Sequence, residues 1–353
     1  MLIDLSNSPH TNITLNCAIA FSKLASNASY RPVLTKCAEL YPALTLMMRC
    51  GIEDIQIYSA VTLCNLAIER TQRSRHIWKE GTVPDFIVNS LLRINSESTK
   101  EICARALFNL LIHDEHRMAH IKDGVLYALV KLARLESVEI RSLCVLALYN
   151  LSCDPVMIDI LMEINVAQVI TKMCEIEFSN QEIHRRLAAC LNNIAMRSGT
   201  EVKLVENGAL LAVIVLSEHN DPPTMRYCSS VLSSLSCQRA NCEAMAATNI
   251  IDVLTKAISA TDDEQQNVFG LNALCNISCV PTLHDRIEES GITSQVMRVL
   301  SLSDKEEISL ACAKVLCNFT YHRKYRKSLL DKDLIDVLLV LFSRNPLSEA
   351  VVS

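Results

Sequence analysis

The sequence has little glycine and few aromatic side chains. Its 353 residues include seven glycines, seven phenylalanines, eight tyrosines and one tryptophan, whereas glycine makes up roughly 7% of average protein composition. Sandwiches and barrels need many glycine and proline turns, so this composition argues against an all-β fold. Half of the residues are hydrophobic, which excludes a disordered chain.

The sequence also lacks an excess of positive charge and a long apolar run. The net charge is −5, which gives no support to nucleic-acid binding. The longest apolar runs, such as 208–216, reach about half of the 18 residues that indicate a membrane span, so we predict no membrane insertion. The first ten residues show no signal peptide. We expect a cytoplasmic protein, with nuclear or cytoskeleton-associated locations left open.

Sixteen cysteines are present, but none forms a C-x-x-C pair, so paired zinc knuckles are excluded. His113, His116 and His120 are interpreted as solvated loop residues rather than metal ligands. Cys275 and Cys279 are interpreted as buried thiols. No P-loop, G-x-S-x-G or H-E-x-x-H motif occurs. We therefore predict no enzyme activity, no cofactor and no metal.

A repeat of 41 to 44 residues runs along the whole chain. Eight nine-residue segments share one pattern, as in AVTLCNLAI at 60–68 and LNALCNISC at 271–279. We call the sixth residue of each segment the anchor. The anchors are Lys23, Asn65, Asn109, Asn150, Asn193, Ser234, Asn276 and Asn318. Such a period indicates a solenoid of stacked repeats.

Each anchor is followed, fifteen or sixteen residues later, by a turn residue. Seven of these eight residues are glycine, asparagine or aspartate, which tolerate a left-handed backbone. They are Ala38, Gly81, Gly124, Asn165, Gly208, Asn249, Gly291 and Asp333. The nine prolines fall where helices are expected to begin. Each repeat is therefore predicted to contain a short first helix, a second helix and a longer third helix that carries the anchor.

The third helix is apolar around the anchor. Leucine or a similar residue stands two residues before the anchor and one residue after it. Five repeats place cysteine six residues before the anchor, at Cys17, Cys103, Cys144, Cys228 and Cys312. A buried cysteine behaves as a small hydrophobic residue. The spacing thus explains much of the cysteine content by packing.

These features resemble the armadillo repeat family, through the third-helix motifs at 148–152 and 273–278 and the glycine between the first and second helices. The resemblance implies an all-α, right-handed superhelical solenoid. It assigns a partial repeat to 1–27 and another to 323–353, with full repeats between them at 28–69, 70–113, 114–154, 155–197, 198–238, 239–280 and 281–322. We treat 1–353 as one array.

The resemblance also implies a concave groove, where side-chain amides hydrogen-bond the backbone of an extended partner. Carried over residue by residue, the candidate ladder is Asn65, Asn109, Asn150, Asn193, Asn276 and Asn318. Lys23 and Ser234 depart from it. The nuclear-import branch places tryptophans four residues before the anchors, and none occurs there, which argues against nuclear-import function.

Basic residues share the helix face of the anchors. Arg105 and Lys314 lie four residues before an anchor, and Arg185 and Arg226 lie eight before. They resemble the catenin-like branch of the family, which takes acidic, extended ligands. The alternative is that they are ordinary solvated side chains. We therefore expect partner binding through the ladder and these four residues, with an acidic partner if the charges take part.

The predicted function is a non-enzymatic scaffold that holds an extended segment of a partner protein. The alternative is a structural component of a large cytoskeletal or ciliary assembly, contacting its neighbours by convex faces and uncapped ends. Neither end of the array reads as a polar capping repeat. We therefore expect a fragment of a longer protein, or ends covered by a partner or by self-association.

Overall fold

The computed structural model describes residues 1–67, 97–112, 117–122, 124–133, 137–176, 180–259, 263–321, 323–331, 334–336 and 338–339. Helices joined by turns make up this part of the chain, and no strand occurs within it. The predicted all-α class is therefore confirmed. The three histidines considered as metal ligands are not covered, because His113 and His116 lie outside the described residues and the side chain of His120 is not described.

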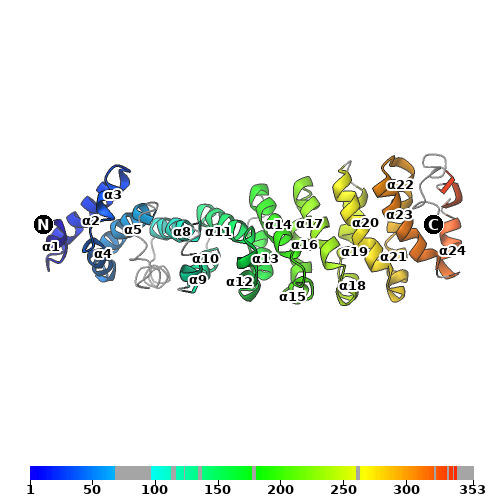
Figure 1. The fold of residues 1–353 in the computed structure, drawn as a ribbon, viewed down its shortest axis with the longest axis horizontal. Helices are drawn as coiled ribbons and strands as arrows, with labels where there is room; N and C mark the ends of the chain where they lie inside the picture. Colours follow the sequence, from blue (N-terminus) through cyan, green and yellow to red (C-terminus); the bar gives the residue numbers. More distant parts are fainter. Residues whose placement is uncertain are drawn as a thin grey trace. The chain divides into compact units, whose positions relative to one another are not determined.

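Eight third helices carry the anchors, as the repeat predicts. Their sequences are apolar on several faces, and many of their apolar side chains are buried; Figure 1 labels these helices along the chain. They are α2 (Thr11–Ser26), α5 (Glu53–Ala67), α8 (Glu97–Ile112), α11 (Val138–Ser152), α14 (Gln181–Ala195), α17 (Pro222–Leu235), α20 (Glu264–Ser278) and α23 (Glu306–Thr320).

First helices are short, and two of them begin as 3-10 turns at a proline. They are α3 (Arg31–Leu34), α9 (Arg117–Lys122), η1 (Pro155–Met157) with α12 (Ile158–Glu163), α15 (Glu201–Glu206), α18 (Arg239–Ala246), η2 (Pro281–Leu283) with α21 (His284–Glu289), and α24 (Arg323–Leu330).

Second helices run between the turn residue and the third helix. They are α1 (Leu2–Ser6), α4 (Leu40–Arg49), α10 (Val125–Leu132), α13 (Val166–Ile176), α16 (Ala209–Ser217), α19 (Ile250–Ser259) and α22 (Ile292–Leu302). The first and second helices expected within 70–96 lie outside the described residues.

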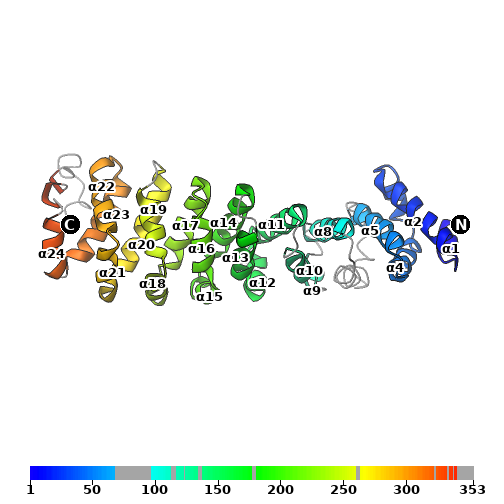
Figure 2. The same ribbon diagram turned by 180° about the vertical axis from the view of Figure 1, so that it is seen from behind.

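The chain divides into two compact units, Met1–Leu151 and Ser152–Ser353. The division falls three residues before the predicted repeat boundary at 154/155. In the second unit, α14, α17, α20 and α23 pack against one another in order, and both views show them side by side (Figures 1 and 2). That 1–353 forms one array stays a prediction.

The predicted core positions are buried. Leu191 and Leu232, two residues before their anchors, and Ile194 and Leu235, one after, are fully enclosed. Burial of a leucine or isoleucine side chain contributes about 1.5–3 kcal/mol. The apolar periodicity of the third helices therefore identified their packing correctly.

The turn between first and second helices uses the left-handed backbone at four of the predicted positions. Gly124, Gly208 and Gly291 have φ values of +87°, +90° and +72°, and Asn165 has +57°. At Asn249 the predicted turn lies between α18 and α19, but its backbone is not left-handed, since positive φ outside glycine occurs only at Asn165 and Asn220 within the described part of the chain. That turn needs no left-handed residue.

Cysteine burial follows the position in the repeat. Cys17, Cys144, Cys228 and Cys312 are buried, as predicted for the position six residues before the anchor. The side chain of Cys103 is not among those described. The prediction that Cys275 and Cys279 are both buried needs correction, because Cys279 is exposed and Cys275 is half-buried. Cys279 lies just past the end of α20, beyond the apolar part of the motif.

No single helix among the described residues has the length and apolar character to span a membrane. One pair of consecutive helices, broken after Ser152, reaches the required length only when the two are taken together.

Candidate functional site

All ten predicted partner-binding residues lie on third helices. The six ladder asparagines are half-buried, Arg185 and Arg226 are half-buried, and Arg105 and Lys314 are exposed. Asn65, Asn109, Asn150 and Arg105 belong to the first unit, and the other six residues belong to the second.

In the second unit, the ladder asparagines are tied to the preceding third helix. The Nδ2 of Asn193 donates a hydrogen bond to Ser152 Oγ at 3.0 Å, and Asn276 Nδ2 donates to Ser236 Oγ at 3.0 Å. Asn318 Nδ2 donates to Ser278 Oγ at 2.9 Å. Each carboxamide is therefore held in one orientation by the repeat before it.

The serine in each tie stands two residues after the preceding anchor. It is buried at Ser152, Ser236 and Ser278. The same position holds Ala25, Ala67, Leu111 and Ala195 in four other repeats. The asparagines at 65, 109 and 150 therefore find no hydroxyl there. These serines were not among the predicted binding residues, although the L-S or I-S pair after the anchor is visible in the repeat.

The tie uses one of the two N–H groups of each carboxamide and leaves its carbonyl oxygen as an available acceptor. No donor within the described residues contacts Oδ1 of Asn193, Asn276 or Asn318. A carboxamide oxygen has two acceptor sites. These three ladder asparagines can therefore accept hydrogen bonds from N–H groups of another chain.

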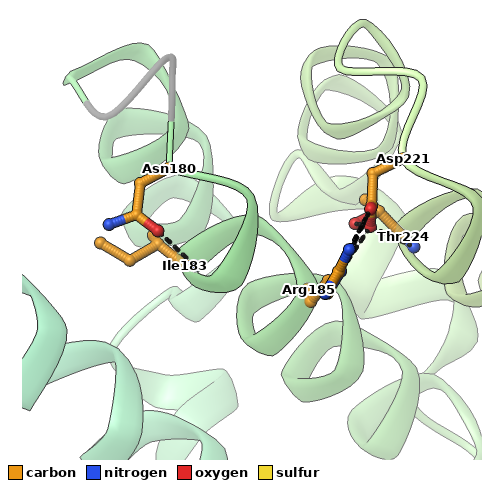
Figure 3. Close-up of polar contacts among 5 residues, drawn as sticks. All are labelled: Asn180, Ile183, Arg185, Asp221 and Thr224. Carbon is orange, nitrogen blue, oxygen red and sulfur yellow. Dashed lines mark hydrogen bonds and ion pairs between the residues drawn. The ribbon is translucent and has the colours of Figure 1, made fainter.

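Arg185 is paired within the protein. Its guanidinium donates to both carboxylate oxygens of Asp221, with Nε at 2.9 Å from Oδ2 and Nη2 at 2.6 Å from Oδ1 (Figure 3). The Asp221 side chain is 2% exposed and that of Arg185 is 40% exposed. A bidentate, charge-assisted pair of this kind joins α14 to the start of α17.

Asp221 also caps α17. It accepts hydrogen bonds from Thr224 N at 3.1 Å and Thr224 Oγ1 at 2.7 Å. The hydrogen bond from Arg185 lowers the pKa of Asp221 to about 2, and the Thr224 donors act in the same direction against burial. Asn180 caps α14 by accepting from Ile183 N (Figure 3).

The next repeat shows the same arrangement in a looser form. Arg226 Nη1 lies 3.4 Å from Asp263 Oδ2, and Asp263 caps α20 by accepting from Gln266 N at 3.0 Å. The basic residue eight positions before the anchor thus faces the N-cap of the following third helix. The sequence did not reveal either arginine–aspartate pair, because the partners lie 36 and 37 residues apart.

Fewer of the four basic side chains are therefore available to a partner than the sequence suggested. The charges of Arg185 and Arg226 face carboxylates of the same chain. Lys314 remains exposed on α23, and Arg105 is exposed on α8. That any of the four binds a partner stays a prediction.

Met196 and Tyr321 add exposed apolar surface at the ends of third helices. No group of three or more histidine, cysteine, aspartate or glutamate side chains in the described part of the chain is arranged to hold a metal ion. The face therefore combines fixed carboxamides, apolar side chains and an exposed lysine.

No protein-family model and no curated protein matches this sequence. Solved structures do match its fold. An engineered protein of the Northeast Structural Genomics Consortium shares 21% identity and a TM-score of 0.60 over 99% of this chain and 85% of its own. A chain from a study of a phosphorylation switch that controls the interaction between cadherin and beta-catenin has a TM-score of 0.67 at 14% identity.

The second match covers 99% of this chain and 66% of the other, so this chain spans about two thirds of its length. A designed armadillo repeat protein in complex with the peptide (KR)4 matches 66% of this chain and 98% of its own, at 21% identity and a TM-score of 0.54. At these identities the likeness concerns the fold. The chain has the armadillo-repeat fold, an all-α solenoid.

Proposed function

We propose that this chain is a non-enzymatic protein-binding scaffold whose third-helix face holds an extended segment of a partner protein. One observation carries the proposal: Asn193, Asn276 and Asn318 occupy the same position in their repeats, and each has its amide nitrogen bound to the preceding repeat. An orientation that is fixed before binding lowers the entropy that a partner must overcome.

The tied carboxamides act as acceptors for backbone N–H groups of the partner. Neighbouring helices pack roughly 8–10 Å apart, and an extended chain advances roughly 3.3 Å per residue. Adjacent anchors such as Asn276 and Asn318 therefore meet N–H groups about three residues apart. Main-chain contacts of this kind supply affinity, while the side chains between them select the sequence.

The partner segment is expected to place a carboxylate near Lys314 and apolar side chains near Met196 and Tyr321. The charges of Arg185 and Arg226 already face Asp221 and Asp263, which concentrates the preference for negative charge at the α23 end of the second unit. The matching designed protein is bound to the basic peptide (KR)4. The exposed lysine here favours the opposite charge.

The test replaces two adjacent ladder residues, Asn276→Ala with Asn318→Ala. Partners are first identified by affinity capture and mass spectrometry, and binding of a purified partner segment is then measured. We expect the affinity to fall about tenfold, because two hydrogen bonds worth about 0.5–1.5 kcal/mol each are lost. The circular dichroism spectrum should not change, since both side chains are only half-buried.

A matched control is Leu211→Ser on α16, an exposed apolar side chain on a second helix. Under the scaffold proposal it leaves the affinity unchanged. A structural component of an assembly that uses convex faces gives the reverse result, with loss of binding in Leu211→Ser and none in the double asparagine variant. That reverse result would contradict the scaffold proposal.

We also propose that the scaffold works in the cytoplasm, with additional pools in the nucleus or on the cytoskeleton. The buried thiols of Cys17, Cys144, Cys228 and Cys312 support a reducing compartment, because they pack as small apolar groups. Imaging of a fluorescently tagged chain tests the location.

A further inference from the structure

Three exposed cysteines share one position in the second unit. Cys153, Cys237 and Cys279 each stand three residues after an anchor, directly behind the serine that ties the next asparagine. We call them the ladder thiols. Their recurrence in an L-S-C or I-S-C triplet distinguishes them from a single surface cysteine.

Each ladder thiol touches an asparagine of the following repeat. The Nδ2 of Asn193 lies 3.5 Å from Cys153 Sγ, and that of Asn318 lies 3.3 Å from Cys279 Sγ. Asn276 Nδ2 lies 4.0 Å from Cys237 Sγ. The sulfur atoms therefore lie against the same amide nitrogens that form the serine ties.

Most other thiols in the unit are enclosed. Burial raises the pKa of Cys190, Cys228 and Cys312 to about 12. Since the thiolate is the reactive form, and a buried thiol is also out of reach of reagents, these cysteines are chemically inert. Among the described residues of the second unit, the exposed thiols are therefore the three ladder thiols and Cys317, which stands one residue before the Asn318 anchor on α23.

We propose that the ladder thiols are a covalent modification site for low-molecular-weight disulfides. Their modification prevents a partner from reaching the ladder asparagines Asn193, Asn276 and Asn318. A group attached to Sγ must occupy space beside the Asn193, Asn276 or Asn318 carboxamide, because each sulfur already contacts its Nδ2. The closing effect rests on the protein-binding function proposed above.

The chemical step is thiol–disulfide exchange. A deprotonated Sγ attacks one sulfur of glutathione disulfide, a new Sγ–S bond forms, and the original S–S bond breaks. The protein thiol is oxidised, and the departing half of the disulfide is reduced and leaves as a thiolate that takes up a proton. A reducing thiol reverses the reaction by the same exchange, so the modification is a reversible switch.

The experiment exposes the whole chain to glutathione disulfide and maps the modified cysteines by peptide mass spectrometry. In parallel, a sample with ¹⁵N-labelled asparagine reports the side-chain amide signals by nuclear magnetic resonance, each assigned by its own Asn→Ala variant. We expect mixed disulfides at Cys153, Cys237 and Cys279, shifted signals of Asn193, Asn276 and Asn318, and full recovery after reduction.

Two variants serve as controls. The triple variant Cys153→Ser, Cys237→Ser, Cys279→Ser should lose these three modifications and the three signal shifts. Cys50→Ser, which removes an exposed thiol of the first unit, should leave both unchanged. Modification that spares the ladder thiols, or that reaches them without moving the three amide signals, overturns the proposal.

Partner binding on the same samples separates this proposal from the scaffold function. Binding that is lost on modification and retained in the treated triple variant supports both. Binding that survives full modification overturns the switch and leaves the scaffold intact. If the unmodified chain binds no partner, the scaffold proposal and the closing effect fail together, while the modification map still decides whether the site exists.

Discussion

At the scale of single residues, Asp221 joins two repeats through one carboxylate. It caps α17 and binds the Arg185 guanidinium of α14 with both oxygens. A buried carboxylate needs such donors, because an unpaired buried charge costs several kcal/mol. The pair thus fixes the start of one third helix against the body of the one before it.

This pair predicts an acid-sensitive contribution to stability. The hydrogen bond from Arg185 lowers the pKa of Asp221 from 3.8 to about 2 in the folded chain. The contribution is therefore fully present above pH 4 and is lost as the pH falls from about 4 to about 2. After allowance for solvent screening we expect about 1 kcal/mol.

The measurement compares the native chain with Asp221→Asn by urea unfolding at several pH values. The difference in unfolding free energy should be largest near neutral pH and shrink toward pH 2. Glu206→Gln, an exposed carboxylate on α15, is the control and should show little difference. An Asp221→Asn difference that stays constant down to pH 2 would contradict the assignment.

The hydrogen bonds from ladder asparagines to serines are a second feature at the scale of single residues. Their presence depends on a serine of the preceding repeat, so Asn193, Asn276 and Asn318 are tied while the asparagines at 65, 109 and 150 lack that partner. Two asparagines at the same repeat position thus differ in how firmly they are held.

At the scale of elements, the turn between first and second helices determines where each second helix begins. Gly208 has φ +90°, and a Cβ added there would meet no atom within 4 Å. Its role is conformational, because the left-handed backbone disfavours any residue with a Cβ. Glycine is therefore required at this turn by the backbone conformation and not by a lack of space for a side chain.

We predict that Gly208→Ala lowers the unfolding free energy by about 1–2 kcal/mol, which is the cost of a left-handed conformation for an ordinary residue. Chemical denaturation measures it. Asn165→Gly, at the same turn of the preceding repeat with φ +57°, is the matched control and should be neutral or slightly stabilising. A neutral Gly208→Ala would mean that the turn relaxes to another conformation.

At the scale of the whole molecule, stability is expected to be local. In a solenoid each repeat contacts only its neighbours, and in the second unit α17 packs against α14 and α20. A defect in one third helix should therefore weaken the adjacent repeats and spare distant ones.

Leu232→Ala tests this expectation. Leu232 is fully buried in α17, and loss of a buried leucine side chain costs about 2–5 kcal/mol. Hydrogen–deuterium exchange should show faster exchange in α14, α17 and α20 and no change in α2 and α5. Uniformly faster exchange along the chain would instead indicate one cooperative unit.

Much of the fold followed from periodicity. The 41 to 44 residue spacing located all eight third helices, and the turn residues located most of the second helices. These features depend on local backbone preference and on apolar side chains at fixed intervals, which a sequence displays directly. Asn249 shows the limit, because a residue that tolerates the left-handed backbone does not have to adopt it.

The candidate site was less predictable, because its contacts link residues about 36 to 43 positions apart. The sequence placed Asn276 and Arg185 on third helices and gave cysteine a packing role at Cys144 and Cys228. Only the tertiary structure decided that Arg185 is bound by Asp221, that Ser236 holds Asn276, and that Cys279 is exposed. The reason is physical: a repeat period fixes which helix faces its neighbour, but the pairing of polar side chains depends on the distances created when two helices pack.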